Sequence, residues 1–287
     1  MNVASSPIFL NSAGNTRSAM TDGIRLLYNI QLPIIPSISG TDVIVKSTLG
    51  GVEREETYDT LTDTSLMLAA DANTPVYITG SITSLTLNIL LLDTNDTLLS
   101  VKCKNTALTE LNCYGCTSLA ELNLSANTAL ERLYCSGCTS LAELNLSANT
   151  ALTELDCSGC TSLAELNLSA NTALTYLYCY GCTSLAELNL SANTALTYLD
   201  CSGCTSLSEL NLSANTALTY LNCQLLYGIE TIKIIAENED VATAIAGAIT
   251  GADSTTGTVY VASDATYYQT ISDAATAKGW TVEAPAA

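Results

Sequence analysis

An eleven-residue unit, repeated eleven times, occupies the middle of this chain. The first leucine of the pattern L-x-x-L-x-[CL]-x-x-[CN]-T-x recurs every eleven residues from Leu108 to Leu218. Alternate units differ, because one carries cysteine at its sixth and ninth positions, as at Cys113 and Cys116, and the next carries leucine and asparagine there. The true period is therefore 22 residues. A fixed period predicts stacked repeats, which together bury a core that one repeat cannot bury alone.

The spacing inside one unit predicts a short strand followed by a turn. The fourth and sixth positions, such as Leu111 and Cys113, point to the same face of a strand, and the third, fifth and seventh point outward. Each 22-residue coil then adds one strand to each of two parallel sheets around a thin core of leucine and cysteine. The chain has one Phe and one Trp, as a thin core requires. Degenerate units, which match the pattern only in part, extend the array upstream at Ile82, Leu85, Leu87, Leu98, Val101 and Cys103.

The pattern L-x-x-L-x-L/C-x-x-N/C resembles that of leucine-rich repeats, in particular the short nested variety of bacterial, phage and prophage proteins. The resemblance covers about 121 of the 287 residues. Two departures from the common form are x-x-L in place of x-L after the Asn or Cys, and the lack of a helical segment. We therefore expect a flattened two-sheet solenoid rather than a horseshoe with a helical outer face. The resemblance implies binding of a partner and leaves its identity open.

The flanks differ from the array and predict three domains in a mainly β chain. Residues 1–81 are predicted as a β-rich attachment domain, 82–228 as a leucine-rich-repeat two-sheet parallel β-solenoid, and 229–287 as a small α/β cap. In the first, strands are expected within 24–28, 30–38 and 43–45, with Gly50 and Gly51 as a turn. The cap should follow a βαβαβ order, with strands at 231–235, 258–262 and 280–283 and helices at 240–249 and 264–278. Asp264 is the expected N-cap and Gly279 the expected C′ residue of the second helix, and the segment from Val259 to Trp280 resembles caps that follow bacterial leucine-rich arrays.

Composition excludes several classes of protein. Nine Lys and Arg against 28 Asp and Glu give a formal charge of −19, which disfavours nucleic acid as a partner. The absence of His removes mechanisms that need an imidazole. No apolar run is long enough to cross a membrane, and residues 1–20 lack the apolar stretch of a signal peptide. We expect synthesis in the cytoplasm, with a virion as the final location and the cytoplasm as the alternative.

The twelve cysteines allow three interpretations. Their C-x2-C spacing falls within the range of structural zinc sites. Disulfides would need a suitable geometry, but stacked coils place equivalent cysteines about 4.8 Å apart with parallel Cβ vectors, which suits them poorly. The third interpretation is a packed ladder of buried thiols. We favour the ladder, because the alternation of leucine and cysteine predicts the positions from Cys113 to Cys204 without a metal. No metal site and no cofactor are predicted.

The half of each coil that carries leucine is almost invariant. It places one glutamate column and one asparagine column on the outer surface. The two columns could coordinate cations, or they could be a copied, soluble face without a ligand. We favour the soluble face. The columns are Glu121, Glu143, Glu165, Glu187, Glu209 and Asn123, Asn145, Asn167, Asn189, Asn211.

The half that carries cysteine keeps its inward residues and varies its outward ones. Seven of the fourteen tyrosines lie there, together with Ser and Asn. Tyr, Ser and Asn on a rigid frame are typical of adaptable recognition surfaces, although cross-strand tyrosines could serve only to stabilise the sheet. We favour binding, because variation is confined to one face. The predicted ligand-binding residues are Tyr134, Asp156, Tyr176, Tyr178, Tyr180, Tyr198, Asp200 and Tyr220.

An enzymatic role has one argument in its favour. Asp156 and Asp200 stand in one column two coils apart, hence about 9.5 Å, with Tyr178 between them. An inverting glycoside hydrolase separates its carboxyl groups by about 6.5 to 9.5 Å. A flat exposed sheet, however, offers neither a pocket nor a buried carboxyl group. We therefore predict no catalytic residue and keep a polysaccharide hydrolase as a remote alternative.

The sequence predicts a non-enzymatic structural or binding protein. Its tyrosine-rich face is expected to recognise a protein or glycan. Residues 1–81 are expected to attach it to virion proteins as a phage head or tail fibre component, with a homo-oligomer possible. The alternative is a bacterial leucine-rich-repeat interaction scaffold or adhesin.

Overall fold

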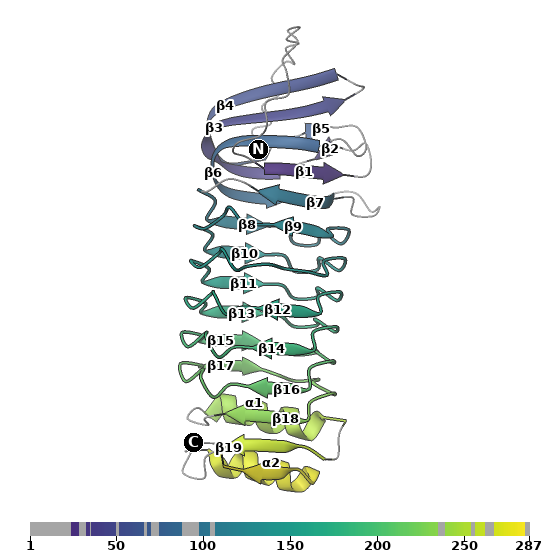
Figure 1. Cartoon of the computed structure of the whole chain (residues 1–287), viewed down its shortest axis with the longest axis vertical. Coiled ribbons are helices and arrows are strands. Elements are labelled where there is room, and N and C mark those ends of the chain that lie inside the picture. Colours follow the sequence, from purple (N-terminus) through teal and green to yellow (C-terminus); the bar gives the residue numbers. More distant parts are fainter. Residues whose placement is uncertain are drawn as a thin grey trace.

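The computed structural model describes the eleven repeats from Leu108 onward completely and the rest of the chain in part. It describes residues 24–28, 33–34, 36–49, 52–65, 68–69, 75–87, 98–103, 107–234, 239–253, 256–261 and 267–284. The coils stack along the long axis of the molecule, with the N-terminal strands at one end and two helices at the other (Figure 1). The architecture is mainly β, as predicted: a two-sheet parallel β-solenoid with a C-terminal α/β cap.

The cysteine halves of the coils form one parallel sheet, which we call the tyrosine sheet. Its strands pair in register, so that the central leucine of each strand lies opposite the central leucine of the next, as Leu155 does with Leu177. This repetition confirms the predicted 22-residue period. The strands are β8 (Glu110–Asn112), β10 (Arg132–Tyr134), β11 (Glu154–Asp156), β13 (Tyr176–Tyr178), β15 (Tyr198–Asp200) and β17 (Tyr220–Asn222).

The leucine halves form the second sheet, which we call the glutamate sheet. Its repeat strands are β12 (Glu165–Asn167), β14 (Glu187–Asn189) and β16 (Glu209–Asn211). The equivalent strand of an earlier coil, β9 (Glu121–Asn123), is connected to the first sheet through β7 and β1. Residues 143–145 form no strand, so the ladder of β7 and β9 ends at β9 and β12 begins a new one. The repeated sequence therefore does not produce a continuous ladder on this side, although Leu144 and Leu146 still point into the core.

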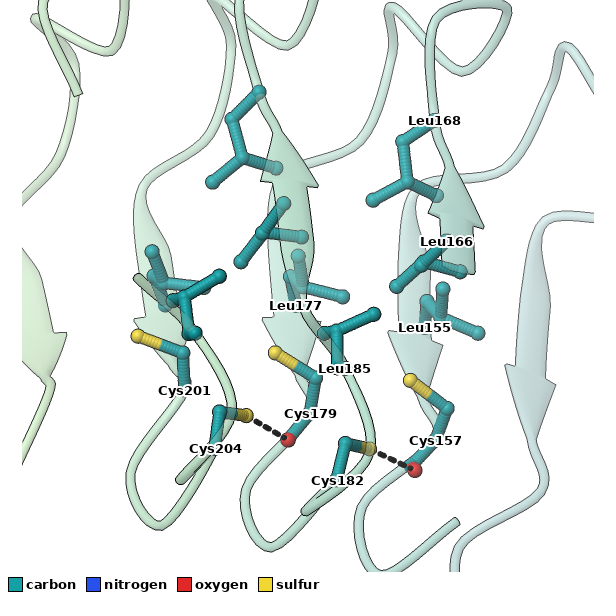
Figure 2. Packing of buried hydrophobic residues seen from close by; sticks show 14 of the residues in the cluster. Leu155, Cys157, Leu166, Leu168, Leu177, Cys179, Cys182, Leu185, Cys201 and Cys204 are labelled. Carbon is teal, nitrogen blue, oxygen red and sulfur yellow. Dashed lines mark hydrogen bonds between the residues drawn. The ribbon is translucent and has the colours of Figure 1, made fainter. Parts of the chain in front are cut away.

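The core between the sheets consists of leucine and cysteine, as the spacing predicts. The repeat leucines and cysteines from Leu108 to Cys223 are at most 8% exposed. Figure 2 shows the leucines and cysteines of neighbouring coils in this core. One prediction was wrong: the seventh position does not always point outward. Ser136 and Ser158 are buried there because their short side chains are covered by adjacent coils, whereas the larger Tyr114 and Tyr180 project beyond them.

The N-terminal strands continue into the array. They are β1 (Ile24–Tyr28), β2 (Pro33–Ile34), β3 (Pro36–Leu49), β4 (Val52–Ser65), β5 (Leu68–Ala69), β6 (Pro75–Leu87) and β7 (Leu98–Cys103). β6 pairs with β8, with Leu85 opposite Leu111, and β7 pairs with β9, with Val101 opposite Leu122. The degenerate upstream units are thus part of the stack. β1 runs antiparallel to both β6 and β7 and joins the two sides.

The strand expected at 24–28 is confirmed as β1, whereas the strands expected further along the chain were too short. The stretch expected at 30–38 includes β2 and the first residues of β3. The stretch expected at 43–45 lies inside the same 14-residue β3, which pairs along its length with β4. Gly40, expected to separate them, lies inside β3 at a shift of register, where a strand tolerates glycine. Leu49 pairs with Val52. The predicted turn at Gly50 and Gly51 lies outside the described residues, and the boundaries at 81 and 228 remain predictions.

The C-terminal segment has the predicted βαβαβ order. Its elements are β18 (Thr231–Ile234), α1 (Glu239–Gly251), β19 (Thr258–Val261), α2 (Tyr268–Lys278) and β20 (Thr281–Glu283). The three strands extend the glutamate sheet, and α1 covers the last coil, where the Cys223 thiol donates to the Ala244 carbonyl oxygen at 3.3 Å. The cap therefore closes the end of the core.

The second helix of the cap starts later than predicted. It begins at Tyr268, with Tyr267 at the N-cap and no side-chain cap bond, and the predicted N-cap, Asp264, lies outside the described residues. Its end is as predicted, because Gly279 adopts the left-handed conformation with φ 84°. Among the described residues, no helix is both long and apolar enough to cross a membrane.

Leu225 is the one described residue other than glycine with a positive φ, at 58°. The equivalent position in the five preceding coils is glycine, from Gly115 to Gly203. Because the Leu225 side chain is 53% exposed, replacing it by glycine removes little packing and relieves the backbone. We expect Leu225→Gly to raise the free energy of unfolding by about 1 kcal/mol, measured by urea denaturation.

The matched control for this prediction is Gly203→Ala, one coil earlier. A Cβ atom there would meet the Gly181 backbone nitrogen at 3.5 Å, which is ordinary contact, so only the backbone conformation is penalised. This variant should lose a similar amount of stability. If Leu225→Gly is instead less stable than the natural chain, the leucine contributes packing that outweighs its conformational cost.

Candidate binding face

The register of the tyrosine sheet brings most of the predicted binding residues together. Tyr176, Tyr198 and Tyr220 lie in one column on β13, β15 and β17. Tyr178 stands in the next column between Asp156 and Asp200. Tyr180 follows β13 in the turn of the same coil. The predicted face is therefore one continuous surface over three or four coils.

The rings in this surface contact one another. The centroids of Tyr198 and Tyr220 are 4.2 Å apart with planes at 8°, which is a stacked pair. Tyr178 and Tyr198 are 4.7 Å apart, and Tyr176 and Tyr198 are 6.1 Å apart. Tyr198 is thus the centre of an aromatic cluster. Ring pairs of this kind add roughly 0.5 to 1.5 kcal/mol each beyond area burial, so the cluster also stabilises the sheet.

The tyrosines of the face differ in exposure. Tyr180, Tyr176 and Tyr220 are 48%, 44% and 43% exposed, so much of their ring area is available to a partner. Tyr134, Tyr178 and Tyr198 are half-buried. Burial raises the pKa of Tyr198 and of Tyr178, so both phenols stay neutral near pH 7. The rings at the centre of the face are therefore uncharged, and the carboxylates of Asp156 and Asp200 flank them.

Tyr134 stands apart from the ring cluster, two coils before Tyr178. Burial, and then the nearby Glu154 carboxylate, raise its pKa to about 12. In the same strand, Arg132 is bound to the Glu110 carboxylate, with Nη2 at 2.9 Å and Nε at 3.0 Å from Oε2. This upper part of the face is held together by polar contacts rather than by stacking.

Asp156 and Asp200 have a structural role that the sequence analysis did not predict. Oδ1 of Asp156 accepts the backbone N–H of Ser158 at 2.9 Å, and Oδ1 of Asp200 accepts that of Ser202 at 3.0 Å. Asn112 makes the same bond to Tyr114 N–H in its own coil. The fifth position therefore caps the turn after the strand. The sequence contains a signal for this turn-capping role, because the fifth position is Asn or Asp in every coil where it is not Tyr.

The asparagine column of the glutamate sheet also caps the turns that follow its strands. The Oδ1 atoms of Asn123, Asn145, Asn189 and Asn211 accept both the N–H and the hydroxyl of the serine two residues later. These oxygens are the amide ligands that a cation would need. In the glutamate column, Lys233 Nζ lies 2.6 Å from Glu209 Oε1, so this carboxylate is paired with a cation of the protein itself. In the described residues, no group of three acidic or cysteine side chains is arranged to hold a metal ion.

The cysteines form the predicted ladder. The eleven cysteines from Cys113 to Cys223 are buried thiols, and none of these eleven forms a disulfide. The thiol at the ninth position donates to the carbonyl oxygen of the sixth-position cysteine one coil earlier, as Cys182 does to Cys157 at 3.1 Å and Cys204 to Cys179 at 3.1 Å (Figure 2). Each thiol thus links two coils as well as filling the core.

Three exposed apolar residues near the face were not predicted as binding residues. Tyr114 is 66% exposed, Leu225 53% and Tyr227 40%. Tyr114 shares its repeat position with Tyr180, which is a signal that the sequence already contained. Leu225 and Tyr227 follow the last repeat strand, where the pattern changes, so the repeat offered no template for their orientation.

Comparison with known proteins finds similarity among solved structures. No family model matches the chain, and no curated protein matches it either. Among solved structures, it is similar to the functional domain of InlJ from Listeria monocytogenes, described as including a cysteine ladder, with 26% identity and a TM-score of 0.37. The match covers 62% of this chain and 35% of that one.

Proposed function

We propose that this chain is a leucine-rich-repeat interaction scaffold without catalytic activity, and that its tyrosine sheet binds a protein partner. The observation that carries the proposal is the contrast between the two sheets. Outward residues repeat almost unchanged on the glutamate sheet, whereas on the tyrosine sheet they change from coil to coil and gather a contacting cluster of four rings. Aromatic side chains with Ser and Asn on a rigid frame supply contact area at low entropic cost.

The same geometry argues against hydrolysis by Asp156 and Asp200. Both carboxylates accept hydrogen bonds from turn residues, and Asp200 Oδ2 also accepts the Asn222 amide at 3.1 Å. These contacts hold both carboxyl groups against turns and strands of the protein itself. We infer a structural role for this pair.

The test is a binding assay with variants whose new residues suit the fold. In Tyr176→Gln/Tyr178→Asn/Tyr180→Ser, the Asn and Ser occur naturally at the same positions of other coils, as Asn112 and Ser158. The labelled chain is applied to a protein array and to a glycan array. We expect the variant to lose at least thirtyfold in affinity for the proteins that the natural chain binds, which corresponds to about 2 kcal/mol from hot-spot residues.

The control for this assay is Glu165→Gln/Glu187→Gln on the glutamate sheet, which should bind like the natural chain. Far-ultraviolet circular dichroism and melting curves establish that all three proteins are folded. Equal binding by the natural chain and the tyrosine variant would refute a role for the face. Binding to glycans alone, or to neither array, would refute a protein partner.

Attachment to a virion through residues 1–81, and assembly of several copies, are further proposals that rest on the sequence. A bacterial scaffold or adhesin fits the repeat architecture better than a virion component does, because the solenoid can fold and bind without being part of a larger particle. What supports attachment is the long antiparallel pair β3 and β4, which extends the stack at the end opposite the cap (Figure 1). Mass photometry of the full chain and proteomics of purified particles test both proposals.

A further inference from the structure

We propose that the partner presents arginine side chains to a patch on the tyrosine sheet. The inference rests on the proposed function and adds the chemistry of the ligand: a guanidinium-bearing protein segment. We call the surface the acid–tyrosine patch. It consists of Glu154, Asp156, Tyr176, Tyr178, Tyr198 and Asp200 on β11, β13 and β15.

Acidic and aromatic residues alternate within this patch. Along the fifth-position column, the order over three consecutive strands is Asp156, Tyr178, Asp200. Along the third-position column, Glu154 is followed by Tyr176 and Tyr198. Neighbouring strands are about 4.8 Å apart, so Tyr176 and Tyr178 each lie one strand from a carboxylate. Tyr198 shares its own strand with Asp200. A planar cation over Tyr178 would therefore have a carboxylate on either side.

The patch has no internal cation to neutralise it. Between Arg132 and Lys233 the sequence contains neither Lys nor Arg. These two residues are already paired, Arg132 with Glu110 at 2.9 Å and Lys233 with Glu209 at 2.6 Å. Within the described part of the chain, no ion pair reaches Asp156 or Asp200. With a formal charge of −19, the whole molecule also attracts a cationic partner to this face.

The same sheet already shows how it accommodates a guanidinium group. Arg132 stands in the third-position column, one strand before Glu154, and directs Nε and Nη2 to a single oxygen of Glu110. The strand spacing thus matches the reach of a guanidinium to the carboxylate next to it. A partner's arginine that occupies the equivalent place further along the column would meet Tyr176 and Glu154.

The chemistry of the rings favours arginine over lysine. A guanidinium group is flat, can stack on an aromatic face and can still direct its N–H groups to a carboxylate in the ring plane. An ammonium group is more strongly hydrated and gains less from such a surface. The exposed rings of Tyr176 and the nearby Tyr220, 44% and 43% exposed, provide that surface.

The experiment uses a fluorescein-labelled peptide with four arginines separated by glycines, and matched peptides with lysine or citrulline. Binding to the full chain is measured by fluorescence anisotropy at 150 mM salt, which screens diffuse attraction. The test variant is Asp156→Asn/Asp200→Asn, because Asn112 and Asn222 occupy the same column and make the same turn contact, so the fold is kept. The control, Glu165→Gln/Glu187→Gln, removes the same charge from the other sheet.

We expect the arginine peptide to bind at least tenfold more weakly to Asp156→Asn/Asp200→Asn, and less than twofold more weakly to the control. It should also bind the natural chain several-fold more tightly than the lysine peptide does, and the citrulline peptide should not bind. Equal losses in the two variants, equal binding of arginine and lysine, or no binding of the arginine peptide would each overturn the inference.

The outcome separates this inference from the proposed function. If the array proteins lose affinity for the tyrosine variant while the arginine peptide does not bind, the face binds a partner of other chemistry and only the inference fails. If the arginine peptide binds the patch but the tyrosine variant keeps every array interaction, the guanidinium site exists and the proposed function fails.

Discussion

Replacing Asn171 with alanine is expected to lower the free energy of unfolding by about 2 to 3 kcal/mol, measured by urea denaturation. The side chain is fully buried, and its Nδ2 donates to two carbonyl oxygens of the preceding coil, Leu146 at 3.2 Å and Asn149 at 2.8 Å. Alanine removes both donors and leaves a small void. The buried asparagine is therefore a clamp between coils, and its loss should be felt throughout the stack.

Two matched variants of the same repeat test the cause. Asn167→Ala removes an exposed asparagine that accepts only the Ser169 N–H at 3.0 Å, so it should cost about 1 kcal/mol or less. Asn171→Cys installs the residue that the other half of each coil uses at this position, where the thiol donates to one carbonyl. It should lose about half as much as Asn171→Ala. Equal losses from Asn167→Ala and Asn171→Ala would contradict a clamp role.

Raising the pH from 8 to 11 is expected to destabilise the chain by about 3 kcal/mol through Cys223 alone. Burial, and then the negative charge of Asp200, raise the pKa of this thiol from 9.0 to about 12. A raised pKa in the folded state means that the stabilisation is complete below pH 9 and is lost as the pH rises toward 12. Burial also raises the pKa of Cys201, so further thiols add to the effect.

The control for the alkaline effect is Cys223→Val, which cannot ionise. Urea denaturation of both proteins is measured at pH 8 and at pH 11, so that any constant cost of the substitution cancels. The decrease in stability between the two pH values should be about 3 kcal/mol smaller in the variant. A decrease of the same size in both proteins would mean that Cys223 reaches solvent in the folded chain.

Much of the fold could be predicted because the same pattern of inward and outward residues recurs in every repeat. Residues two apart share a face of a strand, and this fact alone placed Leu111 and Cys113 inside and Glu110 and Asn112 toward the surface. The cysteine ladder followed from the alternation with leucine. The order of elements in the cap followed from ordinary strand and helix patterns.

The errors occurred where one residue's place depends on other coils or on distant strands. Ser158 is buried by the coils on either side, which no property of serine reveals. The sequence around Gly40 predicts a break between two strands, but β3 continues through this glycine because it is paired with β4 there. The start of α2 at Tyr268 is likewise not marked by a capping side chain.

For the candidate site, the sequence by itself determined which residues share the tyrosine sheet and which column each one occupies, because an in-register stack converts a period of 22 into neighbours. Only the tertiary structure decided what those neighbours do. It brought Tyr178 and Tyr220 into contact with Tyr198, and it bound the carboxylates of Asp156 and Asp200 to their turns. Ring orientation and hydrogen-bond partners depend on the packing of side chains across adjacent coils, and a linear period carries no information about that packing.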